Sequence, residues 1–183
     1  LICLVTEKDC QKAVLFCLPF HRLPVCSRYF PSSSYTRPSY FNADKKHYLP
    51  ILEFIAKQDC RTNFHFEIVA HHIDDEIKAV LKKMPKGRVQ FEIGIQSTNL
   101  KTLGQISRAN PWEEMTNNIK SIMAYGNIHL HVDLIIGLPY EDINSFAKSF
   151  NDVYLLQADM LQVGFLKLLK GAAMNDLIQE HDY

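Results

Sequence analysis

The chain has 183 residues, of which 47% are hydrophobic and 22% charged, and its formal net charge is zero. This length suits one domain with a full core rather than two. A neutral chain with scattered Lys and Arg offers no electrostatic footprint for nucleic acid or an anionic membrane, and no apolar run is long enough to span a bilayer. The opening LICLV is followed at once by polar residues, so it does not read as a signal peptide. We therefore expect a cytoplasmic protein without nucleic-acid or membrane partners and, because the chain starts without Met, a fragment.

Residues 1–40 differ in character from the rest of the chain. They hold Cys3, Cys10, Cys17 and Cys26, a Pro/Ser-rich tract and no sustained helical or strand period. The cysteines form no CxxC pair, which argues against a zinc site or a thioredoxin-like motif. We treat residues 1–40 as an unassigned segment and expect the regular fold to occupy residues 41–183.

From residue 42 onward helices and strands alternate. Asn42 is predicted to cap a helix over residues 42–57 that Pro50 should kink. The buried residues of that helix should be Leu49, Leu52, Phe54 and Ile55. The later elements are a strand at 63–70, a helix at 74–83, a strand at 88–97, a short helix at 100–108, a helix from Asn110 and Pro111 to Gly126, a strand at 128–138, a helix at 141–157 and a strand at 160–170. The helix at 141–157 should bury Ile143, Phe146, Phe150 and either Leu155 or Leu156. Strands separated by helices predict a parallel sheet.

Each predicted strand is apolar on one face and polar on the other. The apolar faces carry Phe64, Phe66 and Ile68, then Val89, Phe91, Ile93 and Ile95, then Ile128, Leu130, Val132, Leu134 and Ile136, then Leu161, Val163 and Phe165. The polar faces carry His65 and Glu67, then Gln90, Glu92, Gly94 and Gln96, then His129, His131 and Asp133, then Gln162 and Gly164. Parallel sheets are covered on both sides, so the apolar faces should meet the helices and the polar faces should line a barrel lumen. We predict an α/β fold, a partial TIM-type (β/α) barrel truncated at both ends, whose lumen holds a polar ligand. The alternative is a self-satisfied network of buried polar groups.

Several short motifs carry a resemblance to a known family. FEIGIQS, followed by Asn99, Leu100 and Ile106-Ser107-Arg108, resembles the fourth-strand region of radical SAM enzymes such as the coproporphyrinogen dehydrogenase group. VDLIIGLPYED resembles their fifth-strand signature. FNADKK, TNFHFEI and DMLQVGFLKLLKG are similar to stretches of bacterial radical SAM proteins that have a cobalamin-binding domain and an unassigned substrate. The resemblance covers about residues 41–183, and the motifs together in this order are specific.

The resemblance implies a set of S-adenosylmethionine contacts. Glu67 and Gln96 would lie beside the adenosyl and methionine moieties, Arg108 would neutralise the methionine carboxylate, and Asp133 would contact the ribose. Gly137-Leu138 would face the adenine. The chemistry agrees, because a guanidinium pairs with a carboxylate and an acidic side chain accepts hydrogen bonds from ribose hydroxyls. The residues that could face the substrate are His65, Glu92, His129, His131 and Gln162.

The sequence departs from the family at the cluster-binding cysteines. Family members hold a [4Fe–4S] cluster with CxxxCxxC, and a reductant such as flavodoxin or ferredoxin supplies the electron that cleaves S-adenosylmethionine to a 5′-deoxyadenosyl radical. Cys10, Cys17 and Cys26 are spaced too widely for that motif. The resemblance therefore implies an intact parent that carries the cluster, with cobalamin in an upstream domain. We expect this chain alone to make no 5′-deoxyadenosine.

Two other functions remain open from the residues. One is a metal-dependent barrel hydrolase, in which His129, His131 and Asp133, with His65 nearby, bind a divalent metal. The other is a non-catalytic barrel remnant that binds a nucleotide-like ligand or none.

Overall fold

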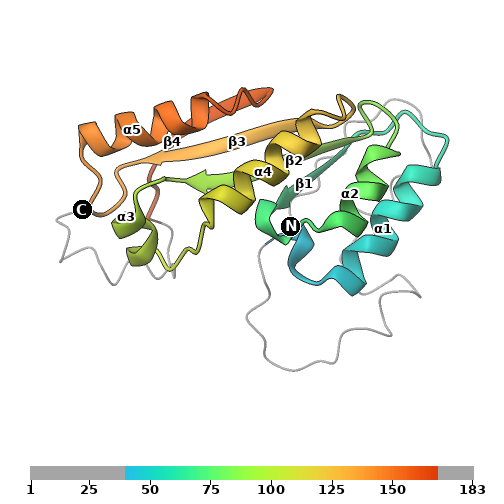
Figure 1. The fold of residues 1–183 in the computed structure, drawn as a ribbon, viewed down its shortest axis with the longest axis horizontal. Helices are drawn as coiled ribbons and strands as arrows, with labels where there is room; N and C mark the ends of the chain where they lie inside the picture. Colours follow the sequence, from blue (N-terminus) through green and yellow to red (C-terminus); the bar gives the residue numbers. More distant parts are fainter. Residues whose placement is uncertain (1–39, 169–183) are drawn as a thin grey trace.

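The computed structural model describes residues 40–168, which form one parallel sheet with helices between its strands (Figure 1). The sheet contains β1 (Phe64–Ile68), β2 (Val89–Gln96), β3 (His129–Ile136) and β4 (Met160–Phe165) in that order. The helices are α1 (Lys45–Lys57), α2 (Asp75–Lys82), α3 (Leu100–Gln105), α4 (Trp112–Met123) and α5 (Ile143–Tyr154), with 3-10 turns η3 (Phe41–Ala43) and η4 (Ala70–His72). The predicted α/β fold with a parallel sheet is confirmed. None of the helices in residues 40–168 is long and apolar enough to cross a membrane.

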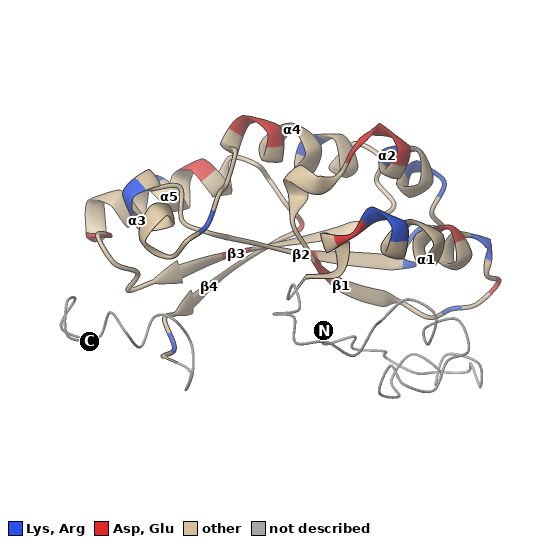
Figure 2. Ribbon diagram, turned by 90° about the horizontal axis from the view of Figure 1, so that it is seen from below, with Lys and Arg blue, Asp and Glu red and all other residues tan. Residues whose placement is uncertain are grey.

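The long helices α1, α2, α4 and α5 lie on one side of the sheet (Figure 2), and the core lies between these helices and the strands. The apolar faces of the first three strands are buried there, as predicted, except for Ile136 at the end of β3, which is only partly buried. The buried residues are Phe64, Phe66, Ile68, Val89, Phe91, Ile93, Ile95, Leu130, Val132 and Leu134. Burial of each such side chain contributes roughly 1.5–3 kcal/mol. The apolar faces therefore fix which way the strands turn, and the polar faces point away from the helices.

The far end of β4 departs from this arrangement. Leu161 packs against the core, but Val163 and Phe165 are 38% and 76% exposed. The expectation that the whole apolar face of the last strand meets a helix is thus wrong within residues 40–168. The reason is that β4 is an edge strand, and α5 packs on β3. Residues 169 and 170 of the predicted strand lie outside the described residues, as do residues 1–39.

The first helix begins two residues later than predicted, with Asp44 as its cap. The Asp44 side chain accepts a hydrogen bond from the Lys46 amide at 3.0 Å. Asn42 instead lies in η3, where its buried amide donates to the Val69 carbonyl at 2.7 Å and accepts from the Val69 amide at 2.8 Å. Asn42 therefore ties the start of the described chain to the end of β1. Inside α1 the buried residues are Tyr48, Leu52 and Ile55, whereas Phe54 is exposed.

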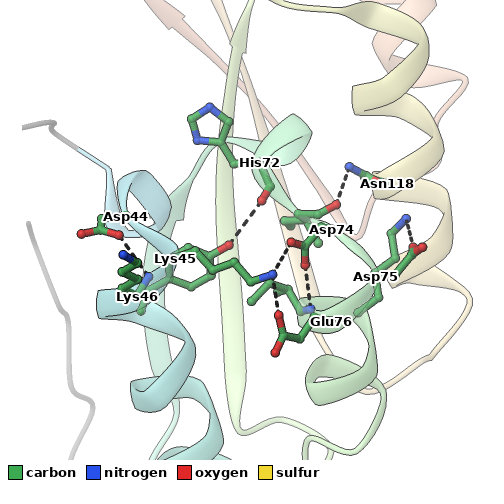
Figure 3. Close-up of polar contacts among 12 residues, drawn as sticks. Asp44, Lys45, Lys46, His72, Asp74, Asp75, Glu76 and Asn118 are labelled. Carbon is green, nitrogen blue, oxygen red and sulfur yellow. Dashed lines mark hydrogen bonds and ion pairs between the residues drawn. The ribbon is translucent and has the colours of Figure 1, made fainter.

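A polar junction holds the starts of α1 and α2 together (Figure 3). Lys45 forms ion pairs with Asp74 and Glu76, and the hydrogen bond from Lys45 lowers the pKa of Asp74. Asp74 also caps α2 by accepting from the Ile77 amide at 3.1 Å. On the other side, the buried Asn118 amide of α4 donates to the carbonyls of Ala70, the first residue of η4, and Ile73, just after it, at 2.9 and 3.0 Å. The connection from β1 to α2 is therefore fixed by three helices.

The starts of α4 and α5 also differ from the prediction. Pro111 rather than Asn110 is the residue before α4, and Asn110 uses its side chain elsewhere. Asp142 and Ser145 form a capping box at α5. Because this cap sets where the helix starts, Ile143 turns to solvent at 77% exposed, contrary to the expectation that it is buried. Leu156 is buried while Leu155 is exposed, and Phe146 and Phe150 are partly buried against the core.

Candidate functional site

The strand register brings the predicted polar residues together on one face of the sheet. Glu67 pairs with Glu92, and Glu92 pairs with His131. Gly94 pairs with Asp133. Residues paired across parallel strands point to the same face, so these side chains form adjacent rows on the face that the helices do not cover. The next row is completed from β4, where Gln162 pairs with Asp133.

An irregularity in the pairing of β2 and β3 shapes the carboxyl end of this face. The register shifts between Gly94 and Gln96, and Gln96 adopts a left-handed φ of 70°. The loop between α3 and α4 binds to β2 where the register shifts. The Arg108 guanidinium donates to the Gly94 carbonyl, and the side-chain amide of Asn110 donates to the Ile95 carbonyl at 2.7 Å. Bulges of this kind often re-aim side chains beside active sites. Here the bulge and the loop together place Arg108 over the end of β2.

Gly94 makes this approach possible because it has no side chain. A Cβ atom at Gly94 would lie 2.3 Å from Gln96 Nε2 and 3.3 Å from Arg108 Nη1. Because Gly94 has no side chain, the ends of Gln96 and Arg108 occupy the space beside Asp133. The Gln96 Oε1 atom is buried and has no hydrogen-bond partner among residues 40–168.

Arg108 is surrounded by acidic groups from three parts of the chain. Burial lowers its pKa, and the negative charges of Glu67 and Asp133, together with Tyr40, act in the opposite direction. An arginine nevertheless stays protonated in proteins. The predicted residues Glu67, Arg108 and Asp133 are therefore electrostatic neighbours. Tyr40 was not predicted, because it precedes the first periodic segment and no sequence signal links it to this face.

The middle of the face holds two imidazoles and two carboxyl groups, which we call the face cluster: His65, Glu92, His131 and Asp133. His65 Nε2 lies 2.9 Å from Glu92 Oε2, and His131 Nε2 lies 3.1 Å from Asp133 Oδ1. The charge of Glu92 also acts on Asp133 from the neighbouring strand. The side chains of His131 and Asp133 are only 9% and 14% exposed. The register places these two pairs side by side across β1, β2 and β3.

The environment shifts the titration of this cluster. Burial, the charge and hydrogen bond of Glu92, and the charge of Glu67 raise the pKa of Asp133 to about 7, while Arg108 opposes the rise. Burial also lowers the pKa of His131, although the Glu92 charge acts against that change. A carboxyl group that is half-protonated at neutral pH inside a polar cluster is typical of functional sites, although structural ion pairs can also produce it.

The face cluster leaves polar atoms without good partners. His65 Nε2, His131 Nε2 and Asp133 Oδ1 are buried and make no well-aligned hydrogen bond within residues 40–168, despite the short approaches to neighbouring carboxyl oxygens. An unsatisfied buried polar atom costs about 1–3 kcal/mol. Within residues 40–168 these atoms fall short of the fully satisfied internal network that was the predicted alternative.

The end of β3 supplies the remaining predicted residues. Gly137 is exposed and has a φ of 89°, a left-handed conformation that favours glycine. Leu138 is buried, so its side chain is not open to a ligand from this edge. The Leu166 amide, which follows β4, donates to the Ile136 carbonyl at 2.8 Å and holds the neighbouring strand end in place. Gly137 thus lies at the carboxyl edge of the sheet, where parallel α/β folds bind their ligands.

Of the residues of the proposed metal-dependent hydrolase, His65, His131 and Asp133 lie in the face cluster, but His129 does not join them. His129 and Asp133 are four residues apart on β3, about 13 Å along a strand, whereas metal–ligand bonds are about 2 Å long. His129 approaches Asp159 at 3.9 Å instead. Within residues 40–168 no group of three or more His, Cys, Asp or Glu side chains is arranged to hold a metal ion. Cys10, Cys17 and Cys26 lie outside the described residues.

A second polar cluster lies at the end of β2, and we call it the serine cluster: Ser97, Thr98, Glu141, Ser149 and Asp152. The Ser149 hydroxyl accepts from the Thr98 amide at 3.0 Å and donates to Glu141 Oε1 at 3.2 Å, and its oxygen lies 3.1 Å from the Thr98 hydroxyl. The Ser97 hydroxyl donates to the same Glu141 oxygen at 2.6 Å. Thr98 also donates to Asp152 at 2.9 Å. These bonds tie α5 and its preceding loop to the end of β2.

Three solved structures share this fold. Coproporphyrinogen III oxidase (HemN) from Escherichia coli, described as a radical SAM enzyme, is 24% identical with a TM-score of 0.51 over 57% of this chain and 24% of its own. The radical S-adenosylmethionine methyltransferase TsrM from Kitasatospora setae, determined with cobalamin and a [4Fe–4S] cluster bound, is 17% identical with a TM-score of 0.65 over 78% and 29%. Elp3 from the archaeon Methanocaldococcus infernus is 17% identical with a TM-score of 0.56 over 74% and 32%.

These likenesses establish the fold, a partial barrel-type α/β sheet like that of radical SAM enzymes. The chain spans about a quarter to a third of the length of each of the three structures. No family model matches the sequence, and no curated protein matches it.

Proposed function

We propose that the polar face of the sheet binds S-adenosylmethionine and that this chain forms the later part of the barrel of a radical SAM enzyme. The observation that carries the proposal is the set of buried, unsatisfied polar atoms beside the partly buried Arg108 at the carboxyl end of the sheet. The shared fold with two structures described as radical SAM proteins supports it. The motif resemblance at residues 91–97 and 132–142 supports it independently.

The residues present fit the cofactor. Arg108 would pair with the methionine carboxylate, since a guanidinium offers two parallel donors to a carboxylate. Gln96, whose Oε1 atom is buried without a partner, would accept from the cofactor, and Glu67 lies within the same electrostatic neighbourhood. Asp133 would accept hydrogen bonds from the ribose hydroxyls. Because Leu138 is buried, Gly137 would meet the adenine at the edge through its backbone.

In this proposal the intact parent protein carries out the iron–sulfur chemistry. When bound beside a reduced [4Fe–4S] cluster, S-adenosylmethionine supplies radical chemistry. We assign the cluster, a flavodoxin- or ferredoxin-type reductant and a cobalamin domain to the parent. The contribution of the described residues is to bind the cofactor carboxylate and ribose and to hold the adenine at the strand edge.

The substrate would lie deeper on the same face. His65 and His131 present buried ring nitrogens there, and His129 and Gln162 flank them on the polar face. Imidazole and amide groups donate and accept hydrogen bonds, so a polar substrate fits better than an apolar one. The class of substrate proposed is therefore a molecule with hydroxyl or amino groups near the carbon that reacts.

Calorimetric titration of S-adenosylmethionine into the full chain tests the proposal. Wild type should bind, and Arg108→Ala should lose about 1.5–3 kcal/mol of binding free energy, the scale of a charged hydrogen bond. Arg61→Ala is the matched control, because Arg61 is exposed and precedes β1 at the opposite end of the sheet. Equal losses in both variants, or no binding by wild type at millimolar cofactor, would refute the proposal.

A further inference from the structure

We propose that Asn110 is a positioning residue for the cofactor site: by holding the Ile95 carbonyl, it fixes the tight turn that brings the Gln96 side chain back to the polar face. The inference rests on the proposed function, in which Gln96 accepts from the cofactor, and it adds a residue that no motif assigns to the site. Asn110 was expected only to cap α4. Pro111 precedes that helix instead, and the Asn110 side chain donates to the Ile95 carbonyl at 2.7 Å.

The Ile95 carbonyl is held by two donors at the irregular end of β2. The register shifts between Gly94 and Gln96, so Ile95 has no paired residue on β3. Its side chain is fully buried in the core, which fixes the residue in place. Its carbonyl accepts from the Ser97 amide at 2.9 Å and from the Asn110 side chain. One donor therefore comes from the strand end and the other from the loop before α4.

The bond from the Ser97 amide to the Ile95 carbonyl closes a three-residue turn around Gln96. A hydrogen bond between residues two apart, with a central φ of 70°, matches the rare and strained form of the γ-turn. Such a conformation is unfavourable for a residue with a side chain, and it persists only where the surroundings impose it. Asn110 holds one side of the turn, and on the other side the Ser97 hydroxyl donates to Glu141 at 2.6 Å.

The turn determines where the Gln96 side chain lies. The register places Gln96 opposite Leu134, whose side chain is buried in the core. The Gln96 amide nevertheless lies in the space that a Cβ atom on Gly94 would fill, beside the Arg108 guanidinium on the polar face. Gln96 Oε1 is buried without a hydrogen-bond partner among residues 40–168. The strained turn thus puts an open acceptor next to the group that would hold the cofactor carboxylate.

A double-mutant cycle on the full chain tests the inference by calorimetric titration of S-adenosylmethionine. Asn110→Ala and Gln96→Ala should weaken binding by about fivefold and about tenfold, the scale of a lost hydrogen bond. Because Asn110 acts through Gln96, the double variant should also lose about tenfold, whereas independent effects would multiply to about fiftyfold.

Asn63→Ala is the matched control for the cycle. The Asn63 side chain also donates to a backbone carbonyl at 2.7 Å, that of Gly87, but it lies just before β1 at the opposite end of the sheet. The same kind of hydrogen bond is lost in this variant, so S-adenosylmethionine should bind it as tightly as it binds wild type. Asn110→Ser, which shortens the side chain, replaces Asn110→Ala in the cycle if the alanine variant does not fold.

A second measurement follows the strain in the turn and needs neither the cofactor nor a variant at Asn110. Glycine adopts a left-handed φ without penalty. Gln96→Gly should therefore unfold at a higher denaturant concentration than Gln96→Ala, the reverse of the usual order within a strand.

The outcomes separate this inference from the proposed function. Losses that multiply in the cycle, or an Asn110 effect that disappears in Arg108→Ala but persists in Gln96→Ala, would overturn the inference and leave the proposed function intact. Greater stability of Gln96→Ala than of Gln96→Gly would do the same. Failure of wild type to bind the cofactor at millimolar concentration would overturn both.

Discussion

The face cluster and the serine cluster are both buried groups of polar side chains at neighbouring places in the fold, yet they are built differently. In the serine cluster the Ser149 hydroxyl accepts from the Thr98 amide and donates to Glu141, and the Ser97 and Thr98 hydroxyls donate to Glu141 and Asp152. In the face cluster His65, His131 and Asp133 each leave a buried atom unsatisfied. The serine cluster closes on itself and holds α5 to β2, whereas the face cluster is open to further partners.

This difference distinguishes buried polar side chains that hold the fold together from those that are open to a ligand. Folded proteins pair nearly all their buried polar atoms, so groups left unpaired call for an explanation such as a ligand. Glu141 shows that the division is not absolute, because its Oε2 atom in the serine cluster is also buried without a partner among residues 40–168. The contrast predicts that changes in the serine cluster reduce stability, while changes in the face cluster reduce binding.

The largest expected effect is on binding at the face cluster. Asp133→Ala should lose about 1.5–3 kcal/mol of S-adenosylmethionine binding, because a charged acceptor for the ribose is removed. Calorimetry at pH 8, where Asp133 is mostly ionised, measures this loss. Asp75→Ala is the control, since the Asp75 side chain is fully exposed on α2. An unchanged affinity in Asp133→Ala would remove the ribose assignment.

Substitutions in the serine cluster should instead lower the free energy of unfolding. Ser149→Ala removes the buried Ser149 hydroxyl that accepts from the partly buried Thr98 amide, and it should lower the free energy of unfolding by about 1–2 kcal/mol. Denaturant melts of Ser149→Ala and of Ser121→Ala provide the comparison. Ser121 is less buried and donates only to the Asn117 carbonyl one helical turn earlier, so its loss should cost less than about 0.5 kcal/mol. Similar costs for the two variants would contradict a structural role for the serine cluster.

Asp133→Asn should make the protein more stable above pH 7. The pKa of Asp133 is about 7 in the folded protein and about 3.9 when unfolded. Between these values the folded state binds more protons than the unfolded state, so wild-type stability falls as the pH rises from about 4 to 7. Allowing for solvent screening, the variant should gain about 1–2 kcal/mol at pH 8 and nothing near pH 4. Chemical denaturation across this range should show the gain grow with pH, and a gain that shrinks would contradict the buried-acid assignment.

The smallest expected change in stability is at Gly94. Gly94→Ala forces the ends of Gln96 and Arg108 to move, but both are flexible side chains, so the free energy of unfolding should fall by less than about 1 kcal/mol. Binding of S-adenosylmethionine should nevertheless weaken severalfold, because both displaced groups would hold the cofactor. Gly104→Ala on α3, where a Cβ atom meets nothing within 4 Å, should leave binding unaffected. A binding loss shared by both alanine variants would point to a general disturbance of the α3 region.

The sequence predicted the sheet and its two faces because alternation of apolar and polar residues is directly visible along a strand. It could not predict the details that depend on contacts between distant segments. The shift between Gly94 and Gln96 appears only when β2 is paired with β3. The exposure of Ile143 follows from the capping box, whose strength competes with the apolar pattern. Asn42 and Asn110 looked like helix caps, but both bind backbone groups of other segments.

The sequence predicted which residues belong to the candidate site. It did not predict how their charges act on one another. Glu67, Gln96, Arg108 and Asp133 were identified through their motifs, and the register confirms that Glu67 and Asp133 belong to the polar face. The influence of the Glu92 charge on Asp133 depends on how the two side chains lie on neighbouring strands, which no spacing reveals. Tyr40 and Asp159 were missed for the same reason, because each acts through a partner far away in the sequence.

The central claim is that the unsatisfied polar face is the binding surface for S-adenosylmethionine. Backbone amide NMR spectra of the labelled full chain, recorded during titration with the cofactor, test it most directly. We expect the largest shift changes at Glu67, Gln96, Asp133 and Gly137, and little change along α1 and α2 on the opposite side of the sheet (Figure 2). Changes that centre on α1 and α2, or no changes at millimolar cofactor, would contradict the claim.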